Sequence, residues 1–144
     1  MRKPTPVEGL VIRYDFLWQN EYQRGRIEGQ KERPCAIVIA APEQNGVVER
    51  VIVAPITHAK PLDGVQAIEI PQKVKRHLGL DAERSWIIID DLNRVRWDDP
   101  GIVPVSRSKW EYGALPHALV CQVQDQVRSQ AKARKVTLMR SVRV

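Results

Sequence analysis

Short apolar runs separated by turn-forming residues occupy the first two thirds of the chain. They cover residues 10–18, 35–42, 47–57, 65–70 and 86–89, and their Val and Ile content favours strands over helices. Asn45-Gly46 indicates a hairpin between the second and third runs, and Pro-Leu-Asp-Gly at 61–64 indicates another turn. Short strands joined by such turns predict a closed or nearly closed antiparallel sheet.

Helical periodicity is found in two places. Residues 72–78 predict a short helix that begins after Pro71 and ends before Gly79. A long helix is predicted from about 114 to 133, where an apolar residue recurs every four positions: Leu115, Leu119, Val123, Val127 and Ala131. We expect this stripe to pack on the sheet or on a second subunit. Residues 135–144 alternate as in a strand, although a frayed tail also fits.

The chain length of 144 residues fits one domain. We therefore expect a single mainly β (α+β) domain over 1–144, with a small barrel at about 9–105, the long helix and a basic tail at 135–144. The apolar runs are far shorter than the roughly 18 residues of a membrane span. Without an apolar segment behind the charged N-terminus, we expect a cytoplasmic protein.

The cysteine and histidine pattern gives no metal motif. Cys35 and Cys121 lie in apolar runs, no Cys or His follows at metal-ligand spacing, and three scattered histidines cannot complete a zinc site by themselves. We expect both thiols to be core residues and no metal or other cofactor to be needed.

The net charge of +6 is confined to the C-terminal part of the chain. Residues 1–106 balance Lys and Arg against Asp and Glu, so the excess comes from 107–144. A basic end on a neutral body is either a solvated surface or a surface for RNA phosphates or an acidic protein segment.

Candidate chemistry lies at the ends of two predicted strands. Arg33 precedes the run that begins at Cys35, whereas Thr57 and His58 end the next run, so the hairpin between them could bring Arg33 near Thr57. A guanidinium, a hydroxyl and an imidazole suit cleavage of RNA, whose own 2′-hydroxyl is the nucleophile. The same residues also fit an ordinary surface arginine, a strand-forming threonine and a solvated histidine.

Residues 19–32 form a long polar segment that carries Gly25 and Gly29. Long loops in compact domains are usually functional or disordered. This segment is therefore where we first expect ligand contacts.

Four segments resemble the MazF/PemK toxins of bacterial toxin–antitoxin pairs. They are GLVIRYDF at 9–16, the glycine-containing loop that leads into KERPCAIVI at 31–39, VIVAPIT at 51–57 and SWIIIDDLN at 85–93. The resemblance covers about residues 9–95. It implies an SH3-like barrel with added helices, usually a homodimer, that cuts single-stranded RNA without metal and leaves a 2′,3′-cyclic phosphate.

Carried onto this chain, the resemblance implies that Arg33 and Thr57 are the catalytic pair, with His58 beside them. The candidate RNA-binding residues are Arg24, Arg26, Lys31, Lys60, Asp91 and Asn93. The implied partners are a second copy of the chain, a cognate antitoxin protein and single-stranded mRNA.

A non-catalytic module of the same fold is the alternative, one that holds a protein or nucleic acid as gyrase-poisoning relatives do. Family members commonly have an acidic residue where this chain has Leu10, and some have an arginine where it has Ile89. These two departures favour the module, whereas retention of Arg33 and Thr57 favours the enzyme.

Overall fold

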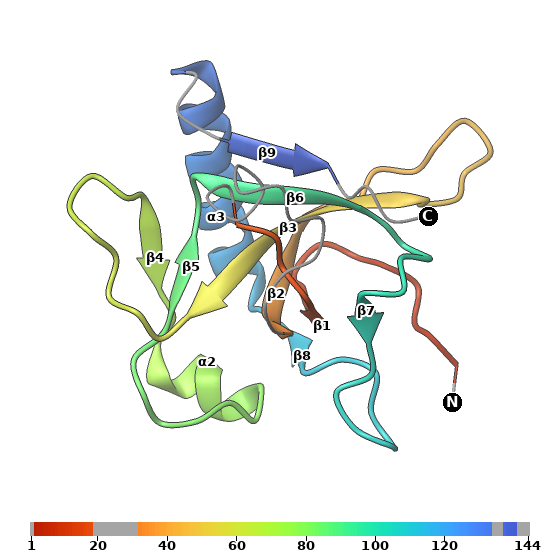
Figure 1. The fold of residues 1–144 in the computed structure, drawn as a ribbon, viewed down its shortest axis with the longest axis horizontal. Coiled ribbons are helices and arrows are strands. Elements are labelled where there is room, and N and C mark those ends of the chain that lie inside the picture. The colour runs from red at the N-terminus through yellow and green to blue at the C-terminus, as the bar shows by residue number, and fades with distance from the viewer. Residues whose placement is uncertain (1, 19–31, 134–136, 141–144) are drawn as a thin grey trace.

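The computed structural model describes residues 2–18, 32–133 and 137–140, which form a mainly antiparallel β half-barrel with a short helix and a long C-terminal helix (Figure 1). The predicted fold class is therefore confirmed. The strands are β1 Leu10–Tyr14, β2 Arg33–Ile39, β3 Arg50–Thr57, β4 Ala67–Glu69, β5 Trp86–Ile88, β6 Asp91–Arg96, β7 Ile102–Val103, β8 Gly113–Ala114 and β9 Thr137–Arg140. The helices are α2 Gln72–His77 and α3 His117–Lys132. Neither of these two helices has the length and apolar content needed to cross a bilayer.

The sheet follows the order β4-β5-β3-β2-β1-β7, and β6 and β8 extend it by pairing with β3 and β1. The hairpin predicted at Asn45-Gly46 joins β2 to β3: Gly46 has a φ of 79° and its amide donates to the Glu43 carbonyl at 2.9 Å. In the ladder that follows, Cys35 lies opposite Pro55. This register determines which ends of β2 and β3 meet.

Side chains of alternate parity fill two apolar clusters on the two faces of the sheet. One cluster holds even-numbered residues such as Val38 and Ile56 together with the α3 stripe of Leu119, Val123 and Val127. The other holds odd-numbered residues of β2 and β3 together with Phe16. Of the two predicted places for the stripe, α3 therefore uses the sheet of its own chain, and Ala131 at the end of the stripe is exposed.

Two sequence-based expectations differ from the structure. Cys35 is buried as expected, but Cys121 is partly exposed, with its Sγ 3.4 Å from His117 Nε2, because it lies beside the buried stripe of α3 and not within it. Strand β6 was not among the apolar runs, because Asp91, Asn93 and Arg94 interrupt its pattern. It pairs with β3 on one side.

Two interpretations were open for the C-terminal segment, a strand or a frayed tail. The strand is confirmed over β9. This strand pairs with β6 in parallel, with Asp91 opposite Thr137 and Arg94 opposite Arg140. It is an exception to the antiparallel pairing of the other strands in the described ranges.

Candidate functional site

Arg33 lies at the rim of the sheet, opposite Tyr14 at the start of β2. Its guanidinium carbon is 5.1 Å from the centre of the Trp18 ring, close enough for a cation–π contact. Its Nε is buried without a hydrogen-bond partner among the described residues. The aromatic face of Trp18 therefore positions the guanidinium at the rim of the sheet.

Thr57 lies at the other side of the same rim, at the end of β3, where it pairs with Trp86 of β5. The β2–β3 register, continued two residues beyond Cys35 and Pro55, sets Arg33 opposite Thr57. Directly opposed residues point to the same face of a sheet. Within the described ranges no hydrogen bond joins the two side chains, and Thr57 Oγ1 accepts one from the Ala59 amide at 3.1 Å.

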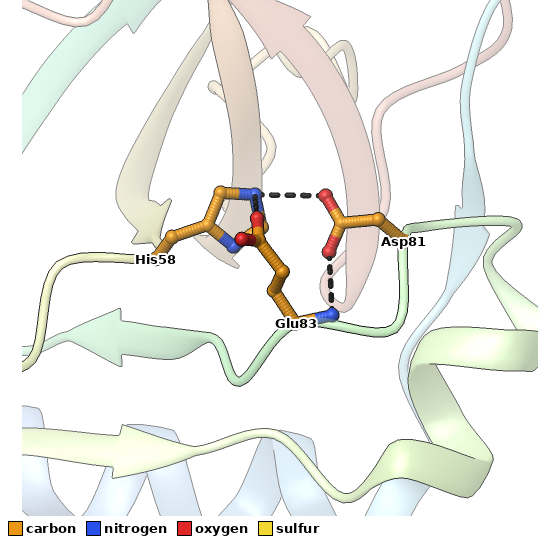
Figure 2. A group of neighbouring side chains, drawn as sticks. All are labelled: His58, Asp81 and Glu83. Carbon is orange, nitrogen blue, oxygen red and sulfur yellow. Dashed lines mark hydrogen bonds and ion pairs between the residues drawn. The ribbon is translucent and has the colours of Figure 1, made fainter.

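His58 turns towards a separate group of side chains, shown in Figure 2. Its Nε2 lies 2.8 Å from Asp81 Oδ2 and 3.6 Å from Glu83 Oε2. Its Nδ1 lies 3.0 Å from Ser85 Oγ and 3.3 Å from the Arg84 carbonyl. Both ring nitrogens are therefore oriented by fixed partners, although no hydrogen bond or ion pair within the described ranges connects His58 to Arg33 or Thr57.

A buried lysine holds the carboxylate that faces His58. Lys75 of α2 is fully buried, and its Nζ donates to Asp81 Oδ1 at 2.9 Å and to the Glu83 carbonyl. The Glu83 amide donates to the same Asp81 oxygen at 3.0 Å. The bond from Lys75, followed by the Glu83 amide and the nearby His58, lowers the pKa of Asp81 below its ordinary value. Asp81 therefore stays ionised, with Oδ2 directed at the imidazole.

Sequence reasoning found His58 but missed its partners Lys75, Asp81, Glu83 and Ser85. They follow His58 at no motif spacing, and the topology brings them together, since β5 pairs with the end of β3. The only sequence signal was the Asp-x-Glu pattern just before a predicted strand.

Among the candidate RNA-binding residues, Arg24, Arg26 and Lys31 lie outside the described residues. Lys60 is exposed just after β3, and Asp91 begins β6 beside β9.

The structure gives Asn93 a structural role in place of the RNA-binding role predicted from the sequence. Its side chain is only 1% exposed, its Nδ2 donates to the Leu17 carbonyl and its Oδ1 accepts from the Leu17 amide, both at 2.9 Å. A base cannot reach an amide that is buried and bonded in this way.

A basic groove of about 550 Å³ lies beside β3 and β6. Arg50 is directly opposite Arg96, and Arg94 follows on the same face. Arg50 lies 3.6 Å from Glu43 and Arg96 lies 2.9 Å from Asp98, whereas Arg94 forms no ion pair within the described ranges. Like charges placed opposite each other destabilise a sheet. A groove in which arginines lie opposite each other despite this cost is suited to binding phosphates or carboxylates.

The chain matches no protein-family model, no curated protein and no solved structure.

Proposed function

We propose that the protein is an endoribonuclease of the toxin class that cleaves single-stranded RNA and leaves a 2′,3′-cyclic phosphate. The observation that carries this proposal is the β2–β3 register, which ends at Cys35 opposite Pro55 and, if continued two residues, would set Arg33 opposite Thr57 at the sheet rim. The cation–π contact with Trp18 adds to it, because it positions the guanidinium.

In the proposed reaction the 2′-hydroxyl of RNA attacks the adjacent phosphorus and the 5′-oxygen leaves. Arg33 stabilises the charge that gathers on the non-bridging oxygens. Thr57 accepts a bond from the Ala59 amide, so its own O–H is free to donate to the phosphate. His58, which follows Thr57 in the chain and is held by Asp81, is the group to which we assign the proton transfer. Because the substrate supplies the nucleophile, this scheme assigns no step to a metal or a covalent enzyme intermediate.

The competing proposal is a binding module without catalysis. One observation favours it: Leu10 and Ile89, which replace charged residues of the family, are buried in the two apolar clusters and add no charge to the rim. Such a module would bind RNA or an acidic protein without cutting it.

The decisive experiment incubates the purified chain with mixed-sequence RNA in EDTA and assays for cyclic-phosphate ends. We expect cleavage by the native chain and a loss of about a hundredfold or more in Arg33→Ala, because one charge-stabilising donor is removed. Arg33→Lys should also be poor, because an ammonium does not reproduce the planar fork.

Arg128→Ala is the matched control, since Arg128 is an exposed arginine on α3 paired with Asp125. It should cleave like the native chain. Full activity in a folded Arg33→Ala variant overturns the assignment of Arg33, and RNA binding without any cleavage favours the module.

The proposed partners and location rest on the resemblance. The chain would act in the cytoplasm as a homodimer restrained by an antitoxin. Since the α3 stripe is buried on its own sheet, another surface must form the dimer. Light scattering that gives twice the 16.5 kDa chain mass would support the dimer, whereas a monomeric mass would contradict it.

A further inference from the structure

We propose that His58, Asp81 and Glu83 bind a divalent transition-metal ion of the zinc type. The three side chains each offer one ligand atom, and these atoms lie within 4.8 Å of one another (Figure 2). The site shares His58 and Asp81 with the reaction scheme proposed above, which assigns no metal to them.

The two distances from His58 Nε2 to the carboxylate oxygens can be compared with those of a zinc site. Nitrogen and oxygen ligands at 2.0–2.2 Å from a tetrahedral zinc ion lie about 3.4 Å from each other. His58 Nε2 is 3.6 Å from Glu83 Oε2, and 2.8 Å from Asp81 Oδ2. The second pair must open by about 0.6 Å, as expected when an ion replaces the proton that now joins the two atoms.

Two of the ligands are anchored through the atoms that would not touch the metal. His58 Nδ1 faces Ser85 Oγ and the Arg84 carbonyl, which keep its proton on Nδ1 when Nε2 coordinates. Asp81 Oδ1 is held by Lys75 and by the Glu83 amide, which leaves Oδ2 to bind the ion. Outer partners of this kind orient metal ligands in proteins, and a plain surface ion pair does not need them.

Charge and accessibility favour a transition metal with open positions. Asp81 and Glu83 bring two negative charges and Lys75 returns one, so a divalent cation finds a net negative site. An imidazole beside carboxylates favours zinc over magnesium or calcium. The side chains are 51%, 51% and 74% exposed for His58, Asp81 and Glu83, so water can complete the coordination.

The test is isothermal titration of the EDTA-treated and dialysed full chain with ZnCl₂, without RNA. His117 and Cys121 form a competing pair on α3, so the titration is done in the His117→Ala/Cys121→Ser background. We expect one zinc ion per chain. His58→Ala, Asp81→Asn and Glu83→Gln should each weaken binding by more than the roughly 10- to 100-fold that loss of an outer partner causes.

His77→Ala is the matched control, because His77 is an exposed histidine at the end of α2. It should bind zinc like its background, and MgCl₂ should not compete. Thermal melting confirms that each variant is folded. Zinc binding that disappears in the His117→Ala/Cys121→Ser background, or persists unchanged in the three ligand variants, overturns the proposal.

A bound ion would hold the His58 imidazole that the proposed proton transfer uses, so zinc should inhibit RNA cleavage; this consequence rests on the proposed function. Zinc binding by a chain that never cuts RNA overturns the ribonuclease alone. Cleavage by a chain that binds no zinc overturns the metal site alone.

Discussion

Asn93 joins two segments that are far apart in the sequence. Its buried amide donates to and accepts from the backbone of Leu17, which precedes the polar segment that we expected to contact ligands. A residue that looks like a base reader in the sequence therefore holds the end of the chain segment after β1 against β6.

We predict that Asn93→Ala lowers the free energy of unfolding by about 1–3 kcal/mol, because the buried Leu17 amide and carbonyl lose their partners. Urea denaturation measures the change. Gln44→Ala, at an exposed position in the β2–β3 hairpin, should leave stability nearly unaltered. Unchanged stability together with weaker RNA binding in Asn93→Ala would restore the RNA-binding interpretation.

Local sequence patterns predicted only part of the candidate site. Arg33 and Thr57 could be found because each lies at the end of an apolar run, and one hairpin relates the two runs. The partners of His58 could not be found, because only the pairing of β5 with β3 brings them to it. The two cysteines also differ in burial, which the sequence did not show. Cys35 lies inside the sheet, where burial raises the pKa of its thiol far above the ordinary value. Cys121 lies at the edge of the apolar stripe of α3 and is partly exposed.

At the scale of elements, Gly9 is the junction where β1 meets α3. Its φ is 92°, and its carbonyl accepts from the Leu115 amide at 2.8 Å. A Cβ atom at this position would lie 2.7 Å from Val120 Cγ2. The helix approaches the sheet this closely because residue 9 has no side chain.

We predict that Gly9→Ala destabilises the protein more than Gly46→Ala does. Both variants incur the cost of a left-handed backbone, about 1–2 kcal/mol, but only Gly9→Ala adds an overpacking cost of about 1–3 kcal/mol. Gly46 is the matched control, because its φ is 79° and a Cβ there meets nothing within 4 Å. Thermal or urea unfolding gives the comparison.

The double variant Gly9→Ala/Val120→Ala separates the two costs. It should recover the part that comes from the Val120 methyl, since that group is then absent. Equal destabilisation in Gly9→Ala and Gly46→Ala would show that the close approach of α3 adds nothing to the loss in the free energy of unfolding.

The elements themselves were predictable where local chemistry determines them. β-branched runs and the Asn-Gly turn predicted β1 to β5, and Pro71 and Gly79 bounded α2. β6 could not be predicted in this way, because its buried Asn93 and its two arginines interrupt the run of apolar residues by which the other strands were recognised. The α3 stripe predicted a buried face, but helical periodicity does not say which surface covers it.

At the scale of the molecule, β9 pairs with the outer side of β6. A strand edge without its neighbour presents free N–H and C=O groups that can pair with other chains. The basic C-terminal segment therefore contributes to the sheet as well as to the charge.

We predict that deleting residues 134–144 lowers the melting temperature and promotes aggregation, because the edge of β6 loses its partner. Arg140→Ala should leave the melting temperature nearly unchanged, since the backbone pairing remains. If Arg140 contacts a phosphate, the dependence of log affinity for RNA on log salt should flatten by roughly 0.7. Melting curves and salt-dependent binding measure these effects; a deletion that alters neither stability nor aggregation contradicts the role given to β9.

The parallel pairing of β6 with β9 also sets an order of events during synthesis. Residues 91–94 are synthesised before α3, and their partners at 137–140 are synthesised only after that helix. Because domains begin to fold as they emerge, the nascent half-barrel holds an open edge for the time that the intervening segment takes to translate. Closing that edge needs a contact between distant parts of the chain, which is slow to form. We therefore expect the edge of β6 to be the part of the sheet that pairs last, and until it pairs its free N–H and C=O groups are open to other chains.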